Sequence, residues 1–358
     1  MTSRTHAYSP FMEFAKLSHA KYPLGSSGVA GMTLAEFGPI DGLALNGPGG
    51  DYGNPALLER IASYCGVTPN MVVAANGCSM ANHLAFAALF EPGEEVLLEQ
   101  PTYELLTATL EFLGAKVRRF QRPAEQGFRV DPTEIERNLT PRTRLIVFCN
   151  LHNPSSAIVD EPTLRAAGEL ARSIGARVLV DEVYLEAVWP RPRTAALLGP
   201  EFVVTSSLTK AYGLSGLRCG WILGDPELVS RIWWINDLFG VHQPFVADQF
   251  SIAAFDRIDR VAARAKNLLG TNRPIALGFL RSRTDLECFI PEHGTTLFPR
   301  LKRGNVEALA KLLRDEYETM IVPGCYFEMP QHFRLGLGIA TETLREGLAR
   351  LAAALDRI

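Results

Sequence analysis

One stretch of this sequence decides how the chain is interpreted: Ser206-Ser207-Leu208-Thr209-Lys210-Ala211-Tyr212-Gly213-Leu214-Ser215-Gly216-Leu217-Arg218-Cys219-Gly220-Trp221. A single lysine, Lys210, stands among small, hydroxylated and glycine residues, and Arg218 follows eight residues later. An apolar run, Phe202-Val203-Val204, precedes it, so we expect the amine to be partly desolvated beside a second cation. Both influences lower the pKa of an amine, which a lysine that forms a Schiff base requires.

Segments typical of β-strands alternate with helical segments upstream of this stretch. The expected strands cover residues 71–75, 95–99, 115–120, 144–149 and 176–180. This βαβ rhythm predicts an α/β fold with a mostly parallel sheet covered by helices. Ligands of such sheets bind beyond the carboxyl ends of the strands. Polar clusters follow three of the strands there: Gln100-Pro101-Thr102-Tyr103, Asn150-Leu151-His152-Asn153-Pro154 and Asp181-Glu182-Val183-Tyr184.

A fourth polar cluster, Asn76-Gly77-Cys78-Ser79, lies between an expected strand and an expected helix. Free backbone N–H groups and the helix dipole make such a turn an anion site. The alternative is a simple glycine turn with Ser79 as the helix cap. Taken alone, the pattern favours the simple turn; the phosphate site depends on its pairing with Lys210 and Arg218 in the resemblance described next.

These motifs resemble, in order, those of the class I/II aminotransferases, fold type I of the pyridoxal-phosphate-dependent enzymes. The chain has their Ser-x-x-Lys followed by Gly-x-x-Gly-x-Arg-x-Gly at residues 207–220, and their Pro-Thr-Tyr, Asn-Pro and Asp-x-x-Tyr at residues 101–103, 153–154 and 181–184. The resemblance covers the chain from about Gly53 to its end. It implies that Lys210 is the aldimine lysine and that Ser207 and Arg218 bind the cofactor phosphate.

The resemblance implies further cofactor ligands. Gly77, Cys78 and Ser79 form the phosphate cup, and Asp181 pairs with the protonated pyridine nitrogen, which makes the ring an electron sink. Tyr184 and Asn153 hydrogen-bond the phenolic oxygen of the ring, and Tyr103 stacks on its face. Lys210, Asp181 and Tyr184 are the expected catalytic residues. Taken singly, the carboxylate could cap a helix, the Asn-Pro pair could be a turn and each aromatic ring could belong to the core.

The substrate ligands are expected on three separate segments. Arg334 lies in an expected strand and either pairs with a structural carboxylate or, as the resemblance implies, grips the substrate's α-carboxylate through two parallel hydrogen bonds. Asn153 and Gly28 are expected beside it. Tyr52 stands near the position of the family tyrosine that reaches the neighbouring subunit's phosphate.

Two positions depart from the family pattern. Leu58 stands where the family usually has arginine. The family commonly continues Asn-Pro-Thr-Gly, whereas this chain has Asn153-Pro154-Ser155-Ser156, so we expect an altered turn and assign no role to the two serines.

The composition is that of a globular protein, with 358 residues, 47% hydrophobic residues and a net charge of -3. Without a basic tail or block, it favours neither nucleic acid nor an anionic membrane as a partner. The six cysteines include no Cys-x-x-Cys pair, so we expect no disulfide framework and no metal site. The N-terminus lacks the apolar region of a signal peptide, and a cytoplasmic location is expected.

Three parts are expected along the chain. Residues 1–45 form an N-terminal arm and part of a small domain, residues 46–265 a large cofactor-binding domain, and residues 266–358 a small α+β domain. Glycine-rich segments at residues 25–29 and 47–50 are either surface loops or part of an arm over the ligand. A long helical region over residues 246–281 is expected to break near Gly270 and Pro274.

We therefore predict a pyridoxal-phosphate-dependent aminotransferase that moves an amino group between an amino acid and a 2-oxo acid. The same residues serve lyases, decarboxylases, cyclases and oxidases of this fold, because geometry decides which bond breaks. A non-catalytic effector-sensing module is a further alternative. We expect a homodimer, since the arm before residue 50 has little to pack on within its own chain.

Overall fold

A computed structural model describes residues 7–47 and 51–358. Its centre is a seven-stranded sheet with the order β1-β7-β6-β5-β4-β2-β3. β7 is antiparallel to β1 and β6, and all other neighbours are parallel. The predicted α/β fold with a mostly parallel sheet is confirmed. The strands are β1 (Val72–Asn76), β2 (Glu95–Gln100), β3 (Lys116–Gln121), β4 (Thr143–Cys149), β5 (Arg177–Asp181), β6 (Phe202–Ser207) and β7 (Cys219–Leu223).

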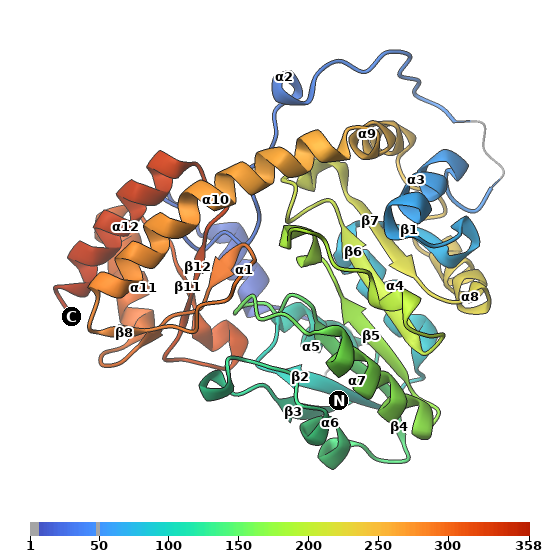
Figure 1. Ribbon diagram of the computed structural model, residues 1–358, viewed down its shortest axis with the longest axis horizontal. Helices are drawn as coiled ribbons and strands as arrows, with labels where there is room; N and C mark the ends of the chain where they lie inside the picture. Colours follow the sequence, from blue (N-terminus) through green and yellow to red (C-terminus); the bar gives the residue numbers. More distant parts are fainter. Residues whose placement is uncertain (1–6, 48–50) are drawn as a thin grey trace.

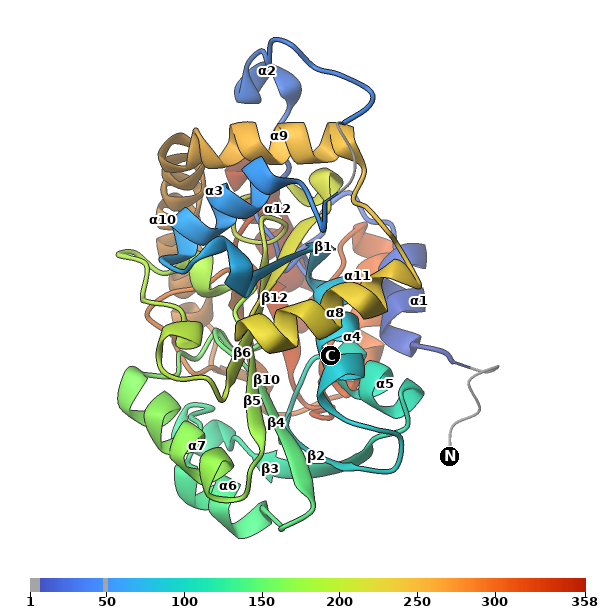
Figure 2. The ribbon, with the colours of Figure 1, turned by 90° about the vertical axis from the view of Figure 1, so that its right-hand side faces the viewer.

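Helices cover both faces of this sheet, with α6 and α7 on one side and α4, α5 and α8 on the other (Figure 1, Figure 2). α7 shows why: Asp160 accepts a hydrogen bond from the Thr163 N–H at its start, and its buried residues recur every three or four positions. The covering helices are α3 (Pro55–Cys65), α4 (Gly77–Leu89), α5 (Glu104–Phe112), α6 (Pro132–Asn138), α7 (Glu161–Ser173), α8 (Pro226–Asp237) and α9 (Phe245–Phe255).

The C-terminal region forms a smaller α+β unit beside the sheet (Figure 1). β11 (Val322–Pro323), β12 (Phe333–Gly336) and β9 (Thr296–Leu297) make an antiparallel sheet, and β10 (Arg300–Leu301) pairs with β8 (Leu286–Glu287). The helices α10 (Ile258–Ser282), α11 (Val306–Tyr317) and α12 (Thr341–Leu355) accompany them. The predicted boundary after residue 265 falls inside α10, and the division into domains stays a prediction.

The expected break near Gly270 and Pro274 is wrong, because α10 runs through both residues. The proline removes only the hydrogen bond to the carbonyl of Gly270, four residues earlier. Gly270 is exposed, so its carbonyl can tilt away from the proline ring toward water, which solvates it. The helical region instead divides at Asp256 and Arg257, between α9 and α10.

Residues 22–30 of the N-terminal arm are packed between the C-terminal α+β unit and the Lys210 loop, and do not lie on the surface. After α1 (Pro10–Leu17), residues 22–30 bond to both parts of the chain: the Gly25 N–H donates to the Met320 carbonyl at 2.8 Å, and the Val29 N–H to the Lys210 carbonyl at 2.7 Å. Leu24 is fully buried. The expectation that the arm has little to pack on is therefore wrong for residues 22–30.

The arm beyond residue 30 is different. α2 (Leu34–Phe37) is short, and residues 41–47 are exposed. Positions 48–50 of the predicted glycine-rich loop, like residues 1–6, lie outside the described residues.

A buried ion pair fixes the sheet edge that carries the polar clusters. Arg122 and Glu99 have fully buried side chains, and the guanidinium donates to the carboxylate. The same carboxylate accepts the Cys149 N–H at 2.9 Å, and the guanidinium donates to the Phe128 carbonyl at 2.7 Å. The carboxyl ends of β2, β3 and β4 are thus tied together just before Asn153.

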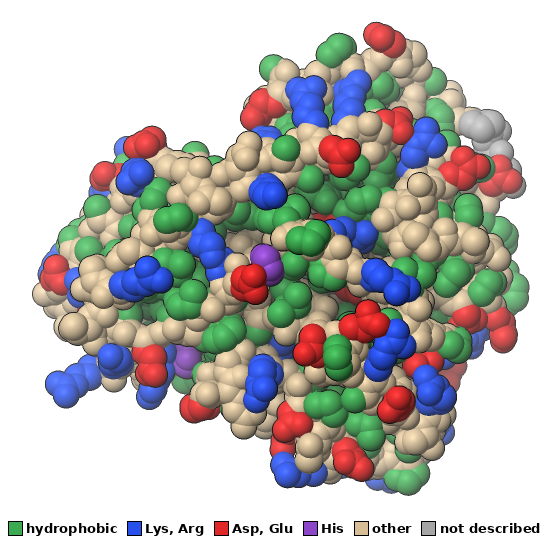
Figure 3. All heavy atoms as spheres, viewed as in Figure 1, with side chains coloured by type: hydrophobic (Ala, Val, Ile, Leu, Met, Phe, Trp, Pro, Cys, Tyr) green, Lys and Arg blue, Asp and Glu red, His purple; other side chains and the backbone are tan. Residues whose placement is uncertain are grey.

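On the face shown in Figure 3, positive and negative side chains are interspersed. Within residues 7–47 and 51–358, no helix is long and apolar enough to cross a membrane. The cytoplasmic location stays a prediction.

Candidate active site

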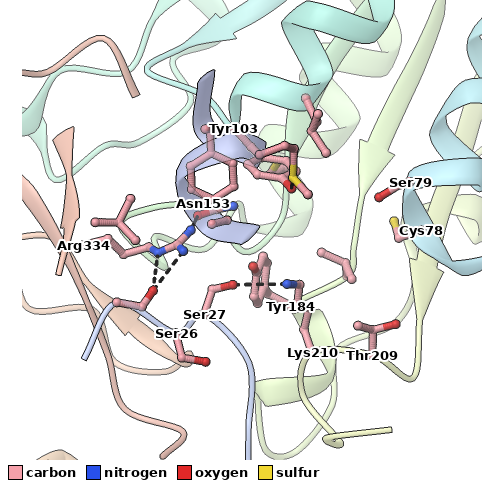
Figure 4. Close-up of a pocket in the computed structure, with 18 of the residues that line it drawn as sticks. Ser26, Ser27, Cys78, Ser79, Tyr103, Asn153, Tyr184, Thr209, Lys210 and Arg334 are labelled. Carbon is pink, nitrogen blue, oxygen red and sulfur yellow. Dashed lines mark hydrogen bonds between the residues drawn. The ribbon is translucent and has the colours of Figure 1, made fainter. Parts of the chain in front are cut away.

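A cavity of about 500 Å³ lies where the carboxyl ends of the large sheet face the arm, α1 and the β11–β12 hairpin (Figure 4). Such a volume is typical of a site for a cofactor or a small ligand. Most of the predicted site residues line it: Cys78, Ser79, Tyr103, Asn153, Asp181, Tyr184, Ser207, Lys210, Arg218 and Arg334.

Lys210 projects into the middle of this cavity (Figure 4). Its Nζ donates a hydrogen bond to the Ser27 hydroxyl at 3.3 Å. Burial, followed by the positive charges of Arg334 and Arg218, lowers the pKa of Lys210 to about 8. The amine is therefore largely neutral in mildly alkaline solution, where it can act as a nucleophile and a base.

Asp181 is the last residue of β5 and also lines the cavity. Its buried carboxylate is held by neutral hydrogen-bond donors. Its oxygens accept from the Asn82 side-chain amide at 2.9 Å, the Val183 N–H at 3.0 Å and the Cys78 thiol at 3.4 Å. Burial raises the pKa of Asp181, and these hydrogen bonds oppose the increase. Within the part of the chain that the structure describes, no cation forms an ion pair with Asp181, so a cationic ligand group would suit it.

A ring of hydroxyl and N–H donors lies at one end of the cavity. Ser79 in the first turn of α4, Ser207 at the end of β6 and Arg218 line it with Thr209, whose buried hydroxyl oxygen has no partner. The residue before α4 makes no side-chain cap, which leaves the first N–H groups of the helix available. This donor set fits a phosphate group.

Gly77 belongs to this end although it does not line the cavity. Its φ of 78° is in the left-handed region that favours glycine, and an added Cβ would collide with the Arg218 guanidinium. The Arg218 Nη2 donates to the Asn76 carbonyl at 3.2 Å. Gly77 thus permits the close approach of the arginine to the helix start.

Arg334 lies at the opposite end of the cavity, on β12. It is only 4% exposed, and its guanidinium donates to the Gly25 carbonyl at 3.0 Å and to the Asn153 side-chain carbonyl at 3.2 Å (Figure 4). No Asp or Glu among residues 7–47 and 51–358 forms an ion pair with it. A buried guanidinium with only neutral partners is suited to a carboxylate ligand.

Two tyrosines stand between the two ends. Tyr184 is 5% exposed, and burial raises its pKa to about 12. Tyr103 precedes α5, its ring packs edge-on against Phe11 at 5.4 Å, and its hydroxyl points to the Met12 sulfur at 3.9 Å. Burial also raises the pKa of Tyr103. Both phenols are therefore neutral donors at the working pH of most enzymes.

Two predicted site residues lie elsewhere. Gly28 packs against the backbone of Lys210, and Ser27 lines the cavity in its place. Tyr52 is 51% exposed, with its ring 5.9 Å from that of Trp233 and outside this cavity. Its assignment to a partner subunit's site stays a prediction.

The turn after Pro154 contains both serines that depart from the family pattern, and its expected alteration stays a prediction. Ser156 adopts a φ of 60°, the conformation that glycine adopts readily, and its hydroxyl lies 2.9 Å from the Thr296 hydroxyl. Gly294 faces it without a side chain, and any Cβ there would collide with Ser156. Ser155 binds the His152 Nδ1 at 2.6 Å. The serines therefore hold the loop that carries Asn153.

Sequence reasoning missed several contacts of the site. Asn82 lies one turn beyond Ser79 on α4, and it links Asp181 to the Thr205 hydroxyl, which donates to it at 2.6 Å. Its helical spacing from Ser79 was a usable signal. Ser27 and the α1 residues could not be found in this way, because only the tertiary fold brings them to Lys210.

The residues present fit pyridoxal phosphate. The ring of donors, with its unpartnered Thr209 hydroxyl, suits the phosphate group. Asp181 has no cationic partner within the described residues and would suit the protonated pyridine nitrogen. Lys210 lines the same cavity between these two groups. When bound, the cofactor would supply an electron sink for a carbanion formed at the substrate.

Comparison with known proteins agrees with this fit. Residues 42–351 match the family model of aminotransferase class I and II. Capreomycidine synthase of Streptomyces vinaceus is 29% identical over 352 residues, covering 94% of this chain and 90% of that protein. A PLP-dependent aminotransferase from Streptococcus suis is 26% identical with a TM-score of 0.90, covering 97% and 96% of the two chains. The PLP-dependent cyclase OrfR has a TM-score of 0.89 at 22% identity over the full length of both chains.

The lowered pKa of Lys210 leads to a prediction about cofactor capture. With the cofactor-free protein, the rate of pyridoxal phosphate attachment should rise with pH, reach half its maximum near the Lys210 pKa of about 8, and level off roughly one to two pH units higher, because the neutral amine is then almost fully formed. Stopped-flow absorbance measures the rate, and borohydride reduction with peptide mapping identifies the lysine.

Nα-acetyl-lysine is the control, since its ordinary amine should make the rate rise far beyond that pH. Identical profiles for protein and control, or attachment to a lysine other than Lys210, would contradict the assignment.

Proposed function

Because the chain belongs to the aminotransferase class I and II family of pyridoxal-phosphate-dependent fold type I enzymes, we propose that it transfers an amino group from an amino acid to a 2-oxo acid. One observation carries the proposal: a buried arginine with no carboxylate partner in the described part of the chain shares one cavity with a lysine of lowered pKa. Arg334 would bind the carboxylate of both substrates. Lys210 would act as base and acid on the α-carbon next to that carboxylate.

The roles of the chain's own residues result from this arrangement. Arg334, supported by Asn153, fixes the substrate carboxylate and so orients the α-C–H bond. With its amine free, Lys210 would accept the proton from the substrate α-carbon as a general base. As a general acid it would then donate a proton to the carbon on the other side of the amino nitrogen. The Asp181 carboxylate would stabilise a positive charge on the nitrogen of the cofactor ring. Asn82 holds this carboxylate in place by a hydrogen bond. Tyr184, whose phenol is neutral, would donate a hydrogen bond to the phenolic oxygen of the cofactor ring.

A cyclase is the second candidate, because capreomycidine synthase is similar to this chain over 94% of its length. Binding of the carboxylate and removal of the α-proton by Lys210 would be common to both reactions. The later steps differ, since a transferase retains the amino group and releases an oxo acid, whereas a cyclase forms a ring within the substrate. The residues named above do not distinguish these outcomes.

A single-turnover experiment separates the two candidates. The loaded enzyme is mixed with each of a panel of amino acids in the absence of any oxo acid, and products are measured by mass spectrometry. An aminotransferase should release one equivalent of 2-oxo acid per active site and then stop until an acceptor oxo acid is added. Continued turnover without an acceptor, or no oxo acid from any amino acid, would contradict the proposal.

We also propose that the chain acts as a homodimer. Large apolar side chains are exposed around the end of α8, where Trp234 is 60%, Leu238 79% and Phe239 59% exposed. Tyr52 packs against Trp233 of the same helix, with the ring centres 5.9 Å apart. Exposed apolar groups of this size are typical of a subunit interface.

Sedimentation equilibrium of the loaded enzyme should give about twice the chain mass of 39.3 kDa. Leu238→Glu should shift it toward monomer, since the carboxylate would be desolvated at the interface. Glu227→Gln, an exposed change at the start of the same helix, is the control. A fully active monomeric wild-type protein would rule the dimer out.

A further inference from the structure

The wall of the cavity beside Arg334 is apolar. Its larger apolar side chains come from α1, the arm, β11 and the residue two before β11: Phe11, Met12, Phe14, Pro23, Val322 and Met320. Val322 is paired with Arg334 across the β11–β12 ladder, and the Phe11 ring centre lies 5.6 Å from the Arg334 guanidinium carbon. A ligand held by Arg334 would therefore lie against this wall.

The charges in the cavity are few, and each has a use. Of the described residues that line it, only Lys210, Arg218, Arg334 and Asp181 carry side chains of the Lys, Arg, Asp or Glu type. The proposed function engages all four with the cofactor or with the substrate carboxylate. Among the described lining residues of this chain, a second carboxylate, an ammonium or a guanidinium on the substrate side chain would find no opposite charge that is free to pair with it. Burial of an unpaired charge is strongly unfavourable.

The helix α1 leaves apolar surface that a ligand can cover. Phe11 is buried among Tyr103, Tyr326 and Phe327, which anchors the helix beside Arg334. Met12 and Phe14 are only partly buried and line the cavity. A flexible methionine next to an aromatic ring can adapt to side chains of different shape.

We propose that this apolar wall is the substrate side-chain subsite, and that the substrate is an amino acid with a neutral, apolar side chain. This inference rests on the proposed function for the placement of the carboxylate at Arg334. α1 determines the specificity for the substrate side chain, mainly through Met12. Met12 provides apolar contact and excludes the water that a longer polar side chain would need as a hydrogen-bond partner. Leucine, methionine and phenylalanine fit this class, whereas glutamate, lysine and arginine do not.

Unreactive carboxylates test the subsite without turnover. Calorimetry on the loaded enzyme measures the dissociation constants of 4-methylpentanoate, glutarate and 4-guanidinobutanoate, which carry an apolar, an anionic and a cationic end. The wild-type enzyme should bind 4-methylpentanoate at least about tenfold more tightly than either of the others. Equal or tighter binding of glutarate or 4-guanidinobutanoate would overturn the proposal.

Two variants place an arginine on α1 and locate the effect. Met12→Arg adds a cation inside the cavity and should shift the preference toward glutarate by about tenfold or more. Leu17→Arg adds the same residue to the same helix at a position that is 70% exposed and outside the cavity, so it should leave the ranking unchanged. Met12→Leu keeps the volume and should also preserve the ranking. Equal shifts in the two arginine variants, or no shift in Met12→Arg, would overturn the subsite.

The outcomes separate this inference from the proposed function. An enzyme that ranks the carboxylates as expected but releases no oxo acid from leucine, methionine or phenylalanine would support the subsite and contradict transamination. An enzyme that releases oxo acid from glutamate or arginine as efficiently as from leucine would support transamination and overturn the subsite.

Discussion

The site depends on two opposite charges that are buried in one cavity and do not neutralise each other. Arg334 is satisfied by the carbonyl of Gly25 and the side chain of Asn153, and Asp181 by Asn82, the Val183 N–H and Cys78. Neutral partners lower the cost of burying each charge but leave the charge itself uncompensated. Each end of the cavity thereby keeps an electrostatic preference for a ligand: an anion at Arg334 and a cation at Asp181. Lys210, which lies between them, has its pKa lowered by burial and by the neighbouring arginines.

The arm is what joins these groups into one rigid site. Gly25 holds Arg334, Ser27 holds the Lys210 amine, and the Val29 N–H holds the Lys210 carbonyl. The approach is close enough that a Cβ on Gly336 of β12 would collide with the Ser26 carbonyl. The C-terminal α+β unit, the arm and the Lys210 loop therefore form successive layers, and a displacement of the arm would alter the positions of both Arg334 and Lys210. A site built this way is preorganised by its backbone contacts.

The sequence alone predicted the parts of the site that depend on local pattern. Strand ends, the glycine turn at Gly77 and the environment of Lys210 are properties of short segments, and the structure brings these segments to one cavity. Long-range packing could not be predicted from local sequence. The sequence of α1 is that of an ordinary amphipathic helix, and only the tertiary structure places it beside Arg334. The continuity of α10 through Pro274 and the left-handed turn at Ser156 depend on neighbours distant in sequence or on solvent exposure, which a local pattern does not contain.

The role of Arg334 is tested by comparing leucine with 3-methylbutylamine, which is leucine without its carboxylate, on the Arg334→Ala enzyme. Charge-assisted hydrogen bonds contribute roughly 1.5–3 kcal/mol each, so kcat/KM for leucine should fall at least about tenfold. Arg334→Lys should recover only part of the loss, because an ammonium cannot reproduce the two parallel hydrogen bonds of the guanidinium. The slow reaction of the amine should be almost unchanged in both variants. If the amine's rate falls as much as that of leucine, Arg334 supports the fold rather than the substrate, and the account is contradicted.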